Sequence, residues 1–231
     1  MISNNIGRRF KRFLNSKIIS SKKIFCISMQ RTGTTSVGGF FKQFDYNTMG
    51  WPQCVKNNWH RLWYDGNYEA IFSSWDFKTG KVFEDSPWWH PEFYRVLFHR
   101  FPRSKFILFT RDPDKWFASM LSHSSGNVLG NPGRHCKIYR REWDYYSLFE
   151  SDSVSSNNNN INKMQLAGKE QHYKELYNLH NKEVVDFFNK FSPDSLFTCN
   201  LEDQQKWIKL GKFIGIDVPA DVEVHMNKSK R

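Results

Sequence analysis

The sequence has no long apolar run. No stretch approaches the roughly 20 consecutive apolar residues that a transmembrane helix needs, and the N-terminal segment lacks the apolar core of a secretory signal peptide. We therefore expect a cytoplasmic protein. Contact with a membrane is expected to be at most weak and peripheral, through basic residues near the N-terminus.

Cysteine and acidic residues are both scarce. The four cysteines show neither zinc-ligand spacing nor a paired framework, which excludes a disulfide scaffold and favours a reducing compartment. The chain has 23 acidic residues and 34 Lys and Arg residues, which gives a net charge of +11. The surface therefore attracts anionic ligands. Because the chain carries no recognised nucleic-acid motif, no specific nucleic-acid partner is expected. The oligomeric state is left open.

The pattern along the chain predicts one domain over residues 23–227. It lies between a basic extension (1–22) and a basic tail (228–231), with a low-complexity, disordered loop at 151–162. Strand and helix signals alternate, which predicts an α/β fold with a central, mostly parallel sheet and helices on both faces. The strand signals are Lys23–Ser28, Glu69–Trp75, Lys81–Phe83, Lys105–Thr110 and Ser195–Asn200. The helix signals are Thr34–Phe44, Pro91–Phe101, Pro113–His123, Lys169–Phe191 and Glu202–Ile214.

The most informative segment is a strand, a tight turn and a helix start between Lys23 and Phe41. Unpaired N–H groups and the positive dipole end of a helix start gather at one point, which favours a bound phosphate. Arg31 adds a fixed charge with a planar set of donors. A corner that binds nothing is the alternative. The turn residues are Arg31, Thr32, Gly33, Thr34, Thr35 and Ser36.

This turn is not the nucleotide-triphosphatase loop, which requires G-x-x-x-x-G-K-[ST]. Thr34 stands where the Lys should be, Ser28 replaces the first Gly, and the cation, Arg31, precedes Gly33. The pattern favours a 5′-phosphate without a metal-bridged triphosphate. A metal-dependent nucleotide or sugar kinase on a related fold, and a non-catalytic nucleotide or nucleic-acid binder, stay as alternatives.

A second motif follows the strand signal Lys105–Thr110. Asp112 suits a helix N-cap and Pro113 the first helical position, which places Arg111 at the end of the strand and Ser119 about two turns along the helix. Open α/β sheets bind ligands beyond the carboxyl ends of their strands. Arg111 and Ser119 are thus predicted to hold another phosphate.

Together, R-T-G-T-T-S and R-D-P-x-x-W-x-x-S resemble the P-loop sulfotransferase family. Phe83–Trp88 (F-E-D-S-P-W) resembles both its E-K-T-P and its D-x-P segments, and Tyr177–Val184 and Leu210–Gly215 resemble its late helices. The resemblance spans about Lys23 to Asn227. Gly211 stands where Cys is usual, and the G-x-x-G-D-W-K-N segment of the cytosolic small-molecule enzymes is missing.

The resemblance implies a P-loop-type three-layer fold and sulfuryl transfer from PAPS (3′-phosphoadenosine 5′-phosphosulfate). The product would be PAP (3′-phosphoadenosine 5′-phosphate), and no metal is expected. The acceptor would be a hydroxyl or amine of a small molecule or glycan. The turn residues from Arg31 to Ser36 would hold the 5′-phosphosulfate, and Arg111 with Ser119 the 3′-phosphate.

The resemblance also implies a base at the F-E-D-S-P-W segment, either Glu84 or Asp85. Asp85 is favoured because the late motifs match the D-x-P group and Pro87 keeps its spacing. Neighbouring strand residues point to opposite faces, so only one carboxylate is expected to enter the site. Arg31 would stabilise the leaving phosphate.

Two further segments are candidates for substrate contacts. The aromatic-rich segment from Gly50 to Tyr68 either binds the acceptor or fills a lid. The Gly/Pro-rich loop from Asn127 to Arg141 is a candidate gate, with Arg134 and His135 available to an anionic substrate.

Overall fold

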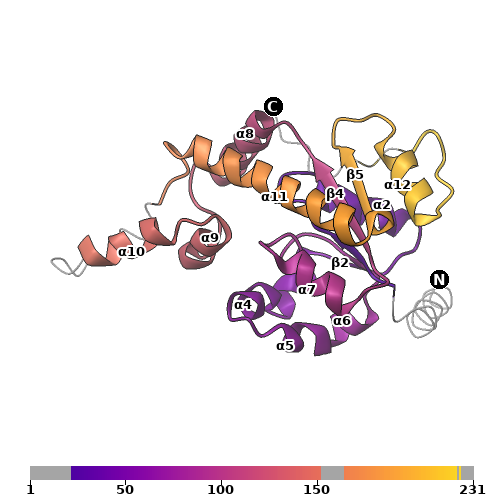
Figure 1. The fold of residues 1–231 in the computed structure, drawn as a ribbon, viewed down its shortest axis with the longest axis horizontal. Helices are drawn as coiled ribbons and strands as arrows, with labels where there is room; N and C mark the ends of the chain where they lie inside the picture. The colour runs from indigo at the N-terminus through magenta and orange to yellow at the C-terminus, as the bar shows by residue number, and fades with distance from the viewer. Residues whose placement is uncertain (1–21, 152–163, 223, 225–231) are drawn as a thin grey trace, which may run out of the picture. The chain divides into compact units, whose positions relative to one another are not determined.

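The structure is a computed structural model that describes residues 22–151, 164–222 and 224 (Figure 1). The predicted basic extension, disordered loop and basic tail lie outside the described residues, apart from Lys22 and Ser151. The chain forms two compact units. The sheet unit runs up to Thr110 and from Val184 onward, and the helical unit is Arg111–Glu183. The single domain expected over 23–227 stays a prediction.

The sheet unit contains a five-stranded parallel sheet in the order β2-β3-β1-β4-β5. The longest pairing joins β4 to β5, from Phe106 opposite Leu196 to Thr110 opposite Asn200. The α/β class with a parallel sheet is thereby confirmed. The strands are β1 (Ile24–Cys26), β2 (Thr48–Met49), β3 (Val82–Phe83), β4 (Lys105–Thr110) and β5 (Leu196–Asn200).

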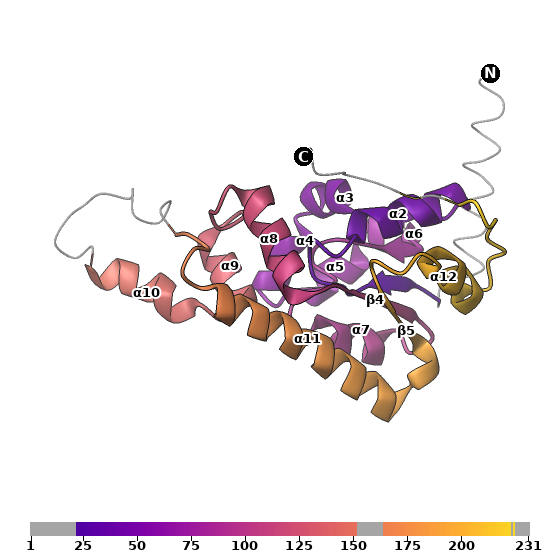
Figure 2. The same cartoon turned by 90° about the horizontal axis from the view of Figure 1, so that it is seen from above.

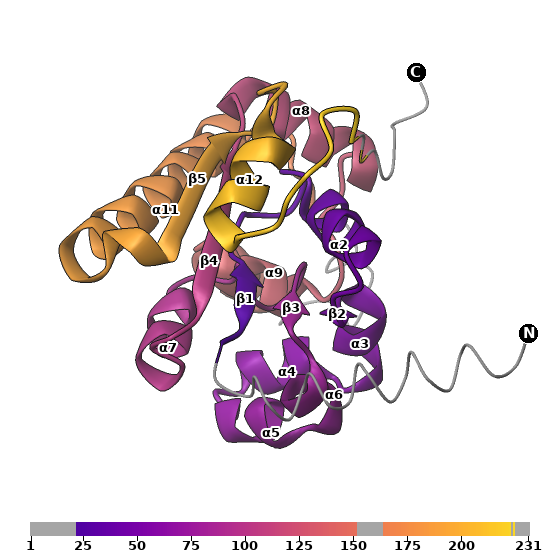
Figure 3. The same cartoon turned by 90° about the vertical axis from the view of Figure 1, so that its right-hand side faces the viewer.

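One face of the sheet packs against α2 (Thr34–Gln43) and α12 (Lys206–Ile214). Val37, Phe40 and Phe41 of α2 recur at helical spacing and are buried there. Phe40 stacks on Trp207 of α12, with ring centroids 5.2 Å apart. Figure 3 shows α2 on this side of the strands and α7 (Phe93–Arg100) on the other.

The opposite face is built from aromatic rings. The Phe25 ring of β1 lies within 5.1–6.4 Å of five other rings, those of Phe77, Phe83, Trp88, Phe101 and Phe106. Phe188, near the end of α11 (Glu170–Phe191), packs on Phe106, with the ring centroids 4.7 Å apart. This packing fixes β1, β3 and β4, the strands that carry the predicted motifs.

The predicted strand at Glu69–Trp75 is wrong. The segment forms α5 (Tyr68–Ser73) and begins α6 (Trp75–Thr79). Asn67 accepts a hydrogen bond from the Ala70 N–H, and Ser74 accepts one from the Phe77 N–H. These two caps start separate short helices where the hydrophobic pattern indicated one strand. The predictions also missed β2, α3 (Trp51–Lys56) and α4 (Trp59–Tyr64).

The helical unit holds α8 (Pro113–Ser124), α9 (Pro132–Ile138), α10 (Glu142–Ser151) and the first part of α11. Figure 2 shows α11 as one continuous helix. The predicted cap of α8 is confirmed, because Asp112 Oδ1 accepts the Lys115 N–H at 3.0 Å and Pro113 occupies the first turn. In the described ranges, no helix has both the length and the apolarity to cross a membrane.

Candidate functional site

The β1–α2 loop (residues 27–33) has an unusual backbone. Arg31 and Gly33 both lie in the left-handed region, with φ of 67° and 80°. Left-handed residues in a tight turn direct successive N–H groups into a concavity that binds anions. A Cβ at Gly33 would lie 2.6 Å from Leu201 Cδ1, and the positive φ would strain any other residue. Position 33 therefore requires glycine.

Two buried hydroxyls hold the loop in this shape. Ser28 Oγ accepts the Phe109 N–H at 2.7 Å, which ties the end of β1 to β4. The Thr32 hydroxyl donates to the Met29 carbonyl and is fully buried. Thr32 thus contributes through the conformation of the loop and not through an open hydroxyl.

The start of α2 carries no compensating negative charge. Its N-cap is Gly33, which has no side chain to cap the helix, and its first turn holds no acidic residue. Thr34 is buried, whereas Thr35 and Ser36 are half-buried. With Arg31 beside it, this end of α2 is electrostatically suited to an anion.

Glu84 lies at the same edge of the sheet and is buried, with 5% of its surface exposed. It follows the last residue of β3, Phe83, and contacts two glycines. A Cβ on Gly38 of α2 would lie 3.0 Å from Glu84 Oε1, and a Cβ on Gly50 would lie 2.0 Å from it. Among the described residues, the other carboxyl oxygen, Oε2, is buried without a hydrogen-bond partner.

Burial raises the pKa of Glu84 to about 8, and the neighbouring charge of Asp85 adds to the effect, while Lys42 opposes it. At neutral pH the Glu84 side chain is therefore mainly a carboxylic acid. In this form it donates a hydrogen bond more readily than it accepts a proton.

Asp85 occupies a different environment. It is half-buried and has a φ of 68°, and its Oδ1 accepts the Ser86 N–H at 2.7 Å. Both carboxyl groups lie beyond the end of β3, so the expected alternation of strand residues does not apply to them. Burial and backbone conformation separate them instead.

The Glu84→Gln substitution is expected to stabilise the fold at alkaline pH. Between pH 4.5 and about 8 the folded wild type keeps a proton that the unfolded chain loses, so its stability falls as the pH rises through this window. Gln has no such proton. Since one pKa unit corresponds to about 1.4 kcal/mol, the gain at pH 8 is on the order of a few kcal/mol. Urea unfolding at pH 5 and pH 8 measures it.

The control is the same substitution at the exposed Glu92, which should leave the pH dependence of unfolding unchanged. Parallel stability curves for wild type and Glu84→Gln over the whole range would contradict the raised pKa of Glu84.

In the helical unit, Arg111 directly follows β4. Its backbone N–H donates to the Tyr177 hydroxyl at 2.7 Å, and the Tyr177 ring stacks on Trp116, with centroids 4.4 Å apart. Within the described part of the chain, Arg111 Nε is buried and finds no hydrogen-bond partner. A buried guanidinium donor without an acceptor is suited to an anionic ligand. Ser119 lies half-buried on α8, one turn beyond Trp116.

Tyr177 was missed as a positioning residue. It belongs to the Y-N-x-H-N-x-x-V segment, which the sequence comparison used only as a family signature. Its chemical role depends on contacts with Arg111 and Trp116, which no local pattern encodes.

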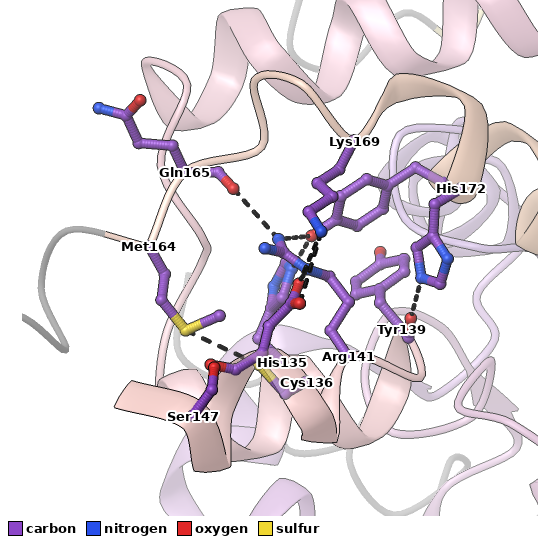
Figure 4. Close-up of polar contacts among 11 residues, drawn as sticks. His135, Cys136, Tyr139, Arg141, Ser147, Met164, Gln165, Lys169 and His172 are labelled. Atoms are coloured by element: carbon purple, nitrogen blue, oxygen red, sulfur yellow. Dashed lines mark hydrogen bonds and ion pairs between the residues drawn. The ribbon is translucent and has the colours of Figure 1, made fainter. Parts of the chain in front are cut away.

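The prediction of a loop from Asn127 to Arg141 is wrong for its central part, which forms α9 (Pro132–Ile138) and carries His135. His135 is only 3% exposed, so it is not available to an anionic substrate. Arg141 Nη1 donates to the Tyr173 hydroxyl at 2.8 Å, which leaves the Tyr173 proton for His135 Nε2 at 2.7 Å. Burial and then the Arg141 charge lower the pKa of His135 to about 3. Figure 4 shows the polar contacts around His135 and Arg141. Arg141 also pairs with Asp144. The network ties α9 to Asp144 of α10 and to Tyr173 of α11.

Comparison with known proteins assigns the family. A protein-family model described as a sulfotransferase domain matches residues 23–231, which is nearly the whole chain. A search of curated proteins finds no match. The chain belongs to the sulfotransferase domain family.

Proposed function

We propose that this protein transfers a sulfuryl group from PAPS to a hydroxyl or amine of a small-molecule or glycan acceptor. The observation that carries the proposal is the β1–α2 loop. Two left-handed residues and the uncapped start of α2 form an anion site there, and Arg31 supplies a fixed positive charge. The family match supports the same reaction class.

The residues present fit both ends of this donor. At the β1–α2 loop, Arg31 and the hydroxyls of Thr34, Thr35 and Ser36 would hold the 5′-phosphosulfate. Arg111, with its unsatisfied buried Nε, and Ser119 would hold the 3′-phosphate. PAPS supplies the sulfuryl group.

The side chains of the protein would provide charge stabilisation and proton transfer. Arg31 and the loop N–H groups stabilise the negative charge on the phosphate oxygen that the sulfuryl group leaves. Asp85 takes the proton of the acceptor hydroxyl, because it is the more accessible carboxyl group of the pair. Glu84, buried and protonated at neutral pH, is the second candidate base.

Nucleotide selectivity tests the proposal. PAP should bind roughly tenfold to a hundredfold more tightly than AMP, because AMP lacks the phosphate assigned to Arg111 and Ser119. One charge-assisted contact is worth about 1.5–3 kcal/mol. Thermal shift and calorimetric titration, both in EDTA, measure the difference. The Arg111→Gln variant should lose most of it.

Equal affinities for PAP and AMP would refute the assignment of Arg111 and Ser119. In a separate measurement without EDTA, stabilisation by ATP with magnesium, and not by PAP, would favour the kinase alternative. Residues 22–151, 164–222 and 224 contain no group of three His, Cys, Asp or Glu side chains placed to hold a metal. Metal independence stays a prediction, which turnover in excess EDTA tests.

A further inference from the structure

The segment after β2 leaves the sheet beside the acid pair. Strands β2 and β3 are parallel neighbours, with Met49 opposite Phe83. The Glu84 N–H donates to the Met49 carbonyl at 3.0 Å, and Gly50 packs directly on the Glu84 carboxyl group. Trp51 is the next residue along the chain after Gly50. Its backbone therefore lies one residue from the contact with Glu84, at the carboxyl edge where parallel sheets bind ligands.

Trp51 differs from the other tryptophans of this segment. Trp59 and Trp63 are buried and fill the core, but Trp51 is 47% exposed. Its indole ring stacks on the His60 imidazole, with centroids 5.9 Å apart and an angle of 21° between the planes. His60 Nδ1 in turn lies 3.6 Å from the sulfur of Cys54, which is buried. One face of the exposed Trp51 indole thus packs on His60, which in turn contacts Cys54.

This juxtaposition combines a flat apolar surface with nearby hydrogen-bonding groups. Glu84 Oε2 has no partner in the described chain, and Asp85 follows directly. Binding sites for small molecules typically pair an aromatic surface with a few polar groups that fix the ligand's orientation. A flexible acceptor without a ring would gain less from the flat indole surface than a rigid ring would.

We propose that Trp51 is the acceptor-binding platform, and that the acceptor is a hydroxyl-bearing ring. The flat face of the ring lies on the indole, and its hydroxyl points to the acid pair Glu84–Asp85. The inference rests on the proposed function and narrows its acceptor class. A phenol and a sugar ring share this chemistry, and the experiment distinguishes them.

The test is calorimetric binding of two probes, 2-naphthol and cellotriose, to the PAP-saturated protein. At least one should bind, and Trp51→Ala should weaken its binding roughly tenfold, in line with the loss of one stacking contact and its buried area. Trp51→Phe should keep most of the affinity. The matched control is Trp75→Ala, since Trp75 is 65% exposed on α6, the helix that leads into the opposite end of β3.

The outcomes separate the two proposals. Absence of PAP binding to the wild type refutes the proposed function itself. If PAP binds wild type and variants equally, the variants are folded and the acceptor data decide. Failure of both probes to bind, or equal weakening by Trp51→Ala and Trp75→Ala, overturns the platform. Weaker probe binding in Trp51→Ala alone supports the assignment of Trp51 as the platform. The probe that binds then identifies the acceptor ring as a phenol or a sugar.

Discussion

Replacing Arg31 with Asn should lower kcat/KM for sulfuryl transfer by roughly 10² to 10³. Removal of one preorganised group that stabilises a developing charge typically costs this much. Asn is the appropriate replacement because position 31 has a φ of 67°, and Asn tolerates the left-handed region better than most residues. The decrease in kcat/KM should therefore arise from the missing charge and not from backbone strain. The measurement is PAP release from PAPS with the ring acceptor that binds.

Arg31→Lys should recover part of the activity, because it restores a charge without the planar set of donors. The control is Arg61→Asn, which removes an exposed arginine paired with Asp65 and should leave kcat/KM unchanged. Wild-type kcat/KM in Arg31→Asn would mean that the β1–α2 loop does not hold the reacting group.

Replacing Asp85 with Asn should reduce kcat by roughly 10² to 10⁴ while PAP affinity stays nearly constant. The amide oxygen of Asn can still accept the Ser86 N–H, so the turn after β3 should be preserved. Single-turnover kinetics with saturating PAPS measures the effect. Glu84→Gln serves as the comparison and should alter stability more than kcat.

The reverse result would exchange the two roles. If Glu84→Gln lost turnover and Asp85→Asn kept it, Glu84 would be the base, and the wild-type rate should then rise with pH through about 8. If both variants kept full turnover, a histidine such as His60 would have to accept the proton.

The parts of this protein that were predictable are those with local determinants. The bounds of β4 and the start of α8 follow from a short apolar run and the Asp112-Pro113 pair, and both agree with the structure. The prediction of a strand at Glu69–Trp75 failed because helix capping by Asn67 and Ser74 outweighed the hydrophobic pattern of the segment. Strand β2 has only two residues and is too short to produce any alternation.

The missing parts of the candidate site depend on residues far apart in sequence. Motif comparison located Glu84, but its burial comes from Gly38 and Gly50, and the resulting shift of its pKa could not be read from neighbouring residues. The same holds for Tyr177, which contacts Arg111 through its hydroxyl. Sequence reasoning located the chemical groups, and the tertiary contacts set their properties.

The contact between Gly33 and Leu201 bears on when the β1–α2 loop can acquire its full packing during synthesis of the chain. The β1–α2 loop is encoded near the start of the chain, but the side chain against which it packs comes directly after the last strand. Contacts between residues so far apart in sequence are slow to form, because closing the intervening chain loses entropy before the contact is made. A nascent chain that has emerged only as far as β4 thus carries the complete loop sequence and the contact of Ser28 with Phe109, but it lacks the Leu201 side chain that packs beside Gly33.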